Sequence, residues 1–171
     1  MSKILGSFSG MRKYLEKDMT AASLQGRIRY GCTTYEGMDG CYVFTVYVDK
    51  IPVKHFSLET LNAYFIKNGY TKNKTPCGTR EYWEEFWDLW DKYSILERTE
   101  YTHDEFCEAL EAYRNQDIRD SINSENPIVR MFAVLDRRIG KRTLQKAKES
   151  IEAQPQWLRQ FYELRFEAEG I

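Results

Sequence analysis

The fold is decided by residues 41–56, which read CYVFTVYVDKIPVKHF. The first half of this stretch is rich in β-branched and aromatic side chains, which favour a β-strand. Its apolar side chains occupy both alternating faces, which is typical of a central strand that is covered on both sides. Asp49 and Lys50 form a tight turn into a strand over residues 51–56. Because Pro52 cannot donate a hydrogen bond to a neighbouring strand, we expect this strand at an edge of the sheet.

The residues on either side extend this sheet. Residues 27–30 (RIRY) predict a preceding strand, and the glycines within 36–40 supply a hairpin turn. Apolar side chains at helical spacing predict one helix over 9–24, which Gly26 ends, and a second over 57–68, which Ser57 caps. We expect both helices to cover the sheet.

The rest of the chain reads as helical after a patternless loop at residues 70–79, which we take as a boundary between lobes. The periodic apolar residues, a Thr102–Glu105 capping box and two prolines predict helices over 79–96, 102–116, 127–139, 141–153 and 155–168. Gly140 is expected to end the third of these in a left-handed conformation.

The predicted fold class is therefore α+β: a small antiparallel sheet of about three strands packed by two helices, followed by a C-terminal all-helical lobe of about five helices. We expect residues 1–75 and 76–171 to form two lobes of one compact domain. The length of 171 residues suits a single domain that buries a core.

Charge is distributed unevenly along the chain. Its formal net charge is only −1, which gives no reason for long-range attraction to nucleic acid or to a membrane. Residues 1–75 carry 11 basic and 6 acidic side chains, residues 76–125 carry 5 and 14, and residues 126–171 carry 9 and 6. The acidic middle either folds against the two basic ends or presents an acidic surface to a partner.

Location and thiol chemistry follow from what the sequence lacks. The first ten residues hold no signal-peptide core, and no run of 18 apolar residues occurs, so we expect a cytoplasmic protein. The cysteines are then expected to be free and mostly buried. A zinc site is a remote alternative, because the candidate ligands lack close pairs. Those ligands are Cys32, Cys41, Cys77, Cys107, His55 and His103.

The helix predicted over 79–96 is both aromatic and acidic. Such aromatic stripes usually form core, but tryptophans ringed by polar groups are also typical of protein interfaces. We take as candidate partner-binding residues Trp83, Trp87, Trp90, Glu84, Asp88 and Asp91.

A basic cluster marks the junction before and after Gly140. These charges could stabilise the end of the preceding helix, with Asp136 as an internal counter-ion, or they could bind the phosphates of RNA or DNA. The candidate nucleic-acid-binding residues are Arg137, Arg138, Lys141, Arg142, Lys146 and Lys148. No recognition-helix or zinc-finger pattern accompanies them.

Signals for catalysis are weak. The sequence contains no phosphate-binding glycine loop and no recognisable nucleophile motif, and its two histidines lie in a capping box and at a strand end. We therefore predict no catalytic residues, no cofactor and no metal, and regard an enzyme as the less favoured class.

Several short motifs resemble a family of small uncharacterised bacterial cytoplasmic proteins over nearly the whole chain. They are Gly26-Arg27-Ile28-Arg29-Tyr30, Gly37-Met38-Asp39-Gly40, Phe56-Ser57-x-Glu59, Asn126-Pro127, the junction from Leu135 to Leu144, and Phe161-Tyr162-x-Leu164-Arg165. The resemblance implies a bacterial origin and a self-contained domain, but no activity.

We expect a non-catalytic protein-binding module, an inhibitor or regulator whose acidic aromatic helix meets a basic surface of another protein. The alternative is binding of a nucleic-acid backbone by the basic junction.

Overall fold

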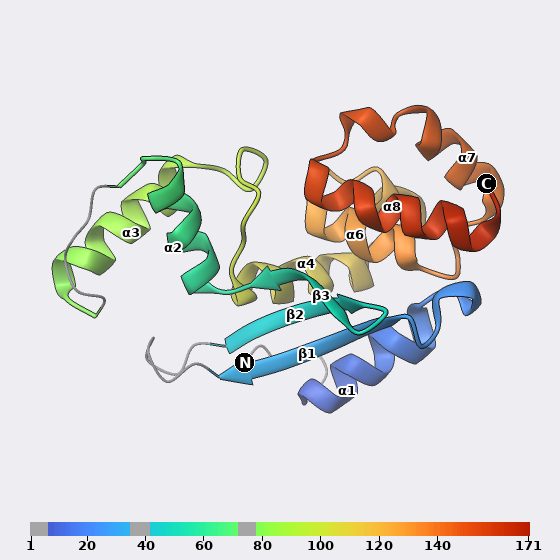
Figure 1. The fold of residues 1–171 in the computed structure, drawn as a ribbon, viewed down its shortest axis with the longest axis horizontal. Coiled ribbons are helices and arrows are strands. Elements are labelled where there is room, and N and C mark those ends of the chain that lie inside the picture. The colour runs from blue at the N-terminus through green and yellow to red at the C-terminus, as the bar shows by residue number, and fades with distance from the viewer. Residues whose placement is uncertain (1–6, 35–41, 72–77) are drawn as a thin grey trace.

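A computed structural model describes residues 7–34, 42–71 and 78–171 of the chain (Figure 1). The predicted hairpin turn at 36–40 and most of the loop at 70–79 lie outside these residues. In chain order the elements are α1 (Phe8–Lys13), a π-helical segment (Tyr14–Met19), a 3₁₀ turn (Ala22–Leu24), β1 (Ile28–Thr34), β2 (Tyr42–Val48), β3 (Ile51–Phe56), α2 (Leu58–Lys67), α3 (Arg80–Lys92), α4 (His103–Asn115), α5 (Ile118–Ile122), α6 (Pro127–Leu135), α7 (Lys141–Glu149), a second 3₁₀ turn (Ile151–Ala153) and α8 (Gln156–Glu169).

The predicted fold class is confirmed, with a three-stranded antiparallel sheet in the order β1-β2-β3. Strand β2 lies in the centre, as its two apolar faces indicate, and β3 lies at the edge. The β2–β3 register slips between Val46 and Tyr47, where Tyr47 pairs with Pro52. This irregularity accommodates a residue that has no N–H to donate.

The turn between β2 and β3 uses two residues with positive φ, Asp49 at 49° and Lys50 at 71°. Such a pair is typical of a type I′ turn, whose twist matches that of the strands it joins. Arg27 supports the turn from outside, because its Nη2 atom lies 2.7 Å from Asp49 Oδ2.

The helix predicted over 9–24 is wrong in its continuity. Only α1 is α-helical, and the chain then widens into the π-helical segment and leaves the helix at Thr20. Thr20 donates its hydroxyl to the Leu15 carbonyl at 2.6 Å and forms a β-bridge with Asp136. Backbone pairing with a segment more than a hundred residues away thus replaces the helical hydrogen bonds.

The prediction that Gly140 ends the helix over 127–139 in a left-handed conformation is wrong, because the chain already leaves the helix at Asp136, the residue that pairs with Thr20. Helix α6 ends at Leu135. Its C-cap Asp136 is extended, at φ −73° and ψ 136°, and the chain pairs there with the N-terminal segment, since Arg137 N donates to Met19 O at 2.8 Å. Gly140 has φ −87° and ψ 166°, and it is the N-cap of α7 rather than a left-handed C-cap. The left-handed C-cap of this region is Gly170, at φ 66°, which ends α8.

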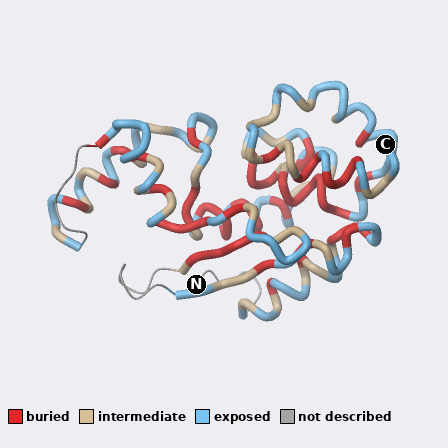
Figure 2. Tube along the Cα trace, in the orientation of Figure 1, coloured by how far each residue is buried: buried red, intermediate tan, exposed pale blue. Residues whose placement is uncertain are grey.

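The sheet is covered by α1 and α4 rather than by α1 and α2. Phe44 of β2 stacks on Phe8 of α1 with centroids 5.9 Å apart, and it meets Phe106 of α4 edge-on at 5.2 Å. Phe44 and Phe106 belong to the larger hydrophobic cluster, which extends into α6 and α8 (Figure 2).

Helix α2 instead packs against α3. Leu61 and Phe65 form a separate, smaller cluster with Phe86 and Leu89 of α3. In Figure 1 these two helices project to one side of the sheet, away from α7 and α8. The division into lobes at residue 75 stays a prediction.

The remaining predicted helices are present, and most of them end earlier than predicted. Helix α4 has the predicted Thr102–Glu105 capping box, but α3 ends at Lys92, and α7 ends at Glu149 before the second 3₁₀ turn. Helix α5 was not predicted. Within the described part of the chain, no helix has the length and apolar character needed to cross a membrane.

Candidate functional site

In helix α3, each residue of the buried stripe comes one position before a tryptophan. Tyr82, Phe86 and Leu89 are the buried side chains of the helix, at the spacing of four and three residues that lines one helical face. Phe86 meets Phe65 of α2 with centroids 5.8 Å apart. None of the three candidate tryptophans is fully buried. The core of the arm formed by α2 and α3 therefore uses side chains of α3 other than the tryptophans.

Trp87 is the exposed centre of the tryptophan group, with 46% of its surface accessible. Its ring stacks on Trp83 at 6.2 Å and lies 5.1 Å from Trp90, and both of these neighbours are half-buried. The guanidinium of Arg98 sits 5.5 Å from the centre of the Trp90 ring. Trp90 is thus held by a cation–π contact while Trp87 faces water.

Two of the three candidate carboxylates flank Trp87 on the helix surface. Glu84 and Asp91 lie three residues before and four residues after Trp87, which makes them its neighbours on the helix surface. Both are exposed, as is Asp88. Glu84 pairs with Arg80 at 2.6 Å, one turn earlier, whereas no ion pair within the described residues engages Asp88 or Asp91. We call Trp83, Trp87, Trp90, Glu84, Asp88 and Asp91 the acidic tryptophan face.

The basic junction is partly occupied by contacts within the chain. Arg138 binds the fully buried carboxylate of Asp136, and this hydrogen bonding raises the pKa of the guanidinium. Lys141 donates from Nζ to the Glu169 carbonyl at 2.7 Å. Asp136 therefore is the internal counter-ion that the sequence indicated.

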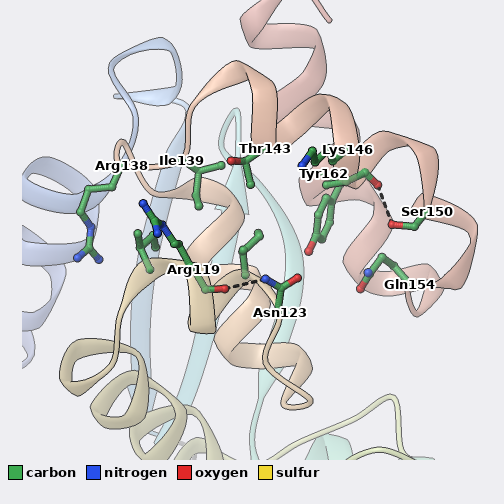
Figure 3. Close-up of a pocket in the computed structure, with 12 residues that line it drawn as sticks. Arg119, Asn123, Arg138, Ile139, Thr143, Lys146, Ser150, Gln154 and Tyr162 are labelled. Carbon is green, nitrogen blue, oxygen red and sulfur yellow. Dashed lines mark hydrogen bonds between the residues drawn. The ribbon is translucent and has the colours of Figure 1, made fainter.

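The other junction residues remain at the surface. Arg137, Arg142, Lys146 and Lys148 are exposed, and within the described part of the chain none of their side chains forms an ion pair. Arg138 and Lys146 both line a cavity of about 720 Å³, which Figure 3 shows between α5, α7 and α8. The structure thus brings two members of the junction to a pocket that the sequence did not reveal.

Other lining residues of this pocket were missed for a specific reason. Arg119 and Asn123 belong to or flank α5, a helix too short to leave a periodic pattern. Tyr162 reads in sequence as one more aromatic core residue of α8. The only sequence feature that could have indicated a site here is Arg119 close to the asparagines at 123 and 126. This pattern is common in loops and does not single out a binding site.

The cysteines show no arrangement for chemistry in the described residues. Cys107 is buried, Cys32 is half-buried, and both are free thiols. Burial raises the pKa of Cys107 to about 11, which keeps it protonated and unreactive at neutral pH. In the described ranges no three metal-binding side chains come together, and Cys41 and Cys77 lie outside these ranges.

The fold is α+β, and Figure 1 shows α3 at one end of it and α7 and α8 at the other. Helix α3 carries the acidic tryptophan face, whereas α7 and α8 supply part of the lining of the basic pocket. The chain belongs to the SF0329 protein family, whose model matches residues 7–166. No curated protein and no solved structure matches the chain. The bacterial origin that the motifs suggest stays an expectation.

Proposed function

We propose that the protein is a non-catalytic binding module that docks another protein, one with a basic surface, on the acidic tryptophan face. The observation that carries this proposal is the exposure of Trp87 between two half-buried tryptophans and two exposed carboxylates. A tryptophan in such a setting offers a large apolar area with a ring of polar groups around it, as interface hot spots do.

Charge supports a basic partner. Asp88 and Asp91 have no counter-ion within the described residues, so the face presents uncompensated negative charge to solvent. Opposite charge on a partner would speed its association and fix its orientation, while burial of the Trp87 ring would slow its release. A regulator or inhibitor acting in the cytoplasm would use its surface in this way.

The proposal is tested by comparing single variants of the full-length chain as bait in cell extract. We expect a protein with a basic surface to be retained by the wild-type chain and lost with Trp87→Ala. Circular dichroism confirms that the variant folds, which is expected because the ring is exposed. With the retained protein purified, Asp91→Asn and added salt should lower the association rate.

The matched control is Ile66→Ala, which removes another exposed apolar side chain from the same arm. Ile66 lies on α2 with 52% of its surface accessible. A protein that the wild type, Trp87→Ala and Ile66→Ala all retain equally binds at another surface. The proposal is overturned if the wild type and Trp87→Ala retain the same set of proteins.

A second candidate function is binding of an RNA or DNA backbone at the basic junction. One observation favours it: Arg137, Arg142 and Lys148 are exposed and, in the described ranges, are not engaged in ion pairs. Fluorescence anisotropy with short RNA and DNA at two salt concentrations tests it. Binding should weaken as salt is added, and Arg142→Ala should reduce the slope of log affinity against log salt concentration by about the amount that one phosphate contact contributes. An absence of binding at low salt eliminates this function.

A further inference from the structure

The cavity beside the basic junction has an uncompensated positive charge. Three cationic side chains line it, Arg119, Arg138 and Lys146, and no carboxylate is among its lining residues. Asp136 neutralises Arg138, but within the described residues neither Arg119 nor Lys146 has an ion-pair partner. The cavity therefore carries two positive charges that no side chain described by the structure balances.

A buried phenol adds a hydrogen-bond donor to this charge. Tyr162 is 1% exposed, and Figure 3 shows its hydroxyl directed into the cavity. No hydrogen bond among the described residues engages this hydroxyl. Burial raises the pKa of Tyr162 to about 12, so the hydroxyl keeps its proton and is available as a donor at neutral pH.

Two amide side chains that line the cavity are oriented by hydrogen bonds within the chain. Gln154 accepts a hydrogen bond from Arg130 Nε on its Oε1 atom at 3.0 Å, which turns its NH₂ group away from that contact as a spare donor. Asn123 donates from Nδ2 to the Arg119 carbonyl at 2.8 Å, which leaves its Oδ1 atom as an acceptor. The cavity thus combines several donors with an amide oxygen that can accept a hydrogen bond from a ligand hydroxyl.

Apolar side chains form another part of the lining, beside the hydroxyl residues Thr143 and Ser150. The apolar residues are Ile118, Ile122, Ile139 and Ala147. The volume of about 720 Å³ lies within the range of small-molecule sites, which pair an apolar lining with a few convergent polar groups.

We propose that this cavity binds a small organic phosphomonoester, with its phosphate between Arg119, Lys146 and the Tyr162 hydroxyl and its carbon body against the isoleucines. A phosphate dianion matches the two unbalanced cations in charge and offers enough acceptor oxygens for all three donors. This site is independent of the acidic tryptophan face and of the partner proposed there.

Phenyl phosphate is the probe, because it joins a phosphate to a flat apolar ring. Titrated into the full-length chain and followed by calorimetry, it should bind at least tenfold more tightly than inorganic phosphate or phenol alone. Lys146→Ala and Arg119→Ala should each weaken its binding about tenfold or more, and Tyr162→Phe should weaken it severalfold.

The matched control is Lys148→Ala, which removes the same charge from the same helix at an exposed position that does not line the cavity. This variant should bind phenyl phosphate as the wild type does. Melting curves identify any variant that fails to fold, and Lys146→Gln replaces Lys146→Ala in that case.

Three outcomes overturn the proposal. Phenyl phosphate does not bind, or it binds no better than phosphate, or Lys148→Ala and Lys146→Ala weaken it equally. The last result would indicate that the ligand binds a diffuse basic surface. The same conclusion would follow if a short oligonucleotide bound the chain and its binding depended equally on Arg142, Lys146 and Lys148. Failure here leaves the docking proposal for α3 intact, because no residue is shared between the two sites.

Discussion

Arg138 binds the carboxylate of Asp136, two residues before it, with Nη2 at 2.6 Å from Oδ2 and Nε at 3.1 Å from Oδ1. The hydroxyl of Tyr113 donates to the same carboxylate from α4. A residue that looks in sequence like one more surface cation is therefore part of a buried network. This network joins α4 to the segment between α6 and α7.

Asp136→Asn should destabilise the protein by about 2 kcal/mol, because it weakens charge-assisted hydrogen bonds to a fully buried group. Arg138 is partly exposed and can regain water, which limits the loss. Urea melts measure the change. Arg137→Ala, at an exposed neighbour, should stay within about 0.5 kcal/mol of wild type; equal effects of the two variants would contradict a structural role for the carboxylate.

Replacement by alanine should destabilise the protein at Gly170 but have almost no effect at Gly140. Gly170→Ala forces a side chain into the left-handed region and should cost about 1 kcal/mol. Gly140→Ala should be nearly neutral, since its φ is negative and an added Cβ meets nothing within 4 Å. Gly140→Asp should gain a few tenths of a kcal/mol as a better N-cap. Thermal melts of the three variants decide, and a large loss in Gly140→Ala would contradict this backbone assignment.

Glu105 both caps α4 and neutralises Arg98, and the two roles can be separated. The Arg98 side chain is 2% exposed and that of Glu105 is 8% exposed. Glu105→Gln keeps a capping side chain but leaves a buried guanidinium unpaired, and should cost about 3 to 5 kcal/mol. Thr102→Ala removes the other half of the capping box and should cost about 1 kcal/mol. Chemical denaturation compares them, and similar losses would show that the carboxylate acts only as a cap.

Quenching of tryptophan fluorescence should report the charge around Trp87. Caesium should quench more efficiently than iodide at low salt, because neighbouring carboxylates attract the cation and repel the anion. The difference should shrink with added salt and in the double variant Asp88→Asn, Asp91→Asn. Trp87→Phe should remove most of the quenchable emission. Equal quenching by the two ions would show that the exposed ring does not lie in an acidic setting.

Stability should fall as the pH rises above about 10, the pKa of an unfolded tyrosine. Burial raises the pKa of Tyr30, Tyr101, Tyr113 and Tyr162, the last to about 12. The folded state then retains protons that the unfolded state loses, so this contribution is complete below pH of about 10 and is lost as pH rises through the raised pKa values. Burial lowers the pKa of Lys54, so its contribution to stability changes with pH in the opposite direction. The four tyrosines together outweigh this single lysine.

Urea melts at a series of alkaline pH values measure this dependence, with tyrosinate absorbance followed in parallel. Tyr30→Phe should make the decline shallower by removing one of the four protons. A free energy of unfolding that stays constant above pH of about 10 would contradict the burial of these hydroxyls.

The sequence by itself determined the elements whose signals are local. Apolar residues on both faces of the strand indicated that β2 is central. Pro52 placed β3 at the edge, and the Thr102–Glu105 box located the start of α4. Each of these signals rests on hydrogen bonds or side-chain periodicity within a few residues, so it survives in any tertiary context.

Tertiary structure alone decided where helices stop and which charges stay free. The helix over 9–24 breaks, and α6 ends early, because Thr20 and Asp136 pair through their backbones across the fold. The same packing buries Asp136 against Arg138 and brings Arg119 and Tyr162 to one cavity from helices α5 and α8. Such contacts join residues far apart in the chain, and local propensity carries no information about which distant groups will satisfy each other.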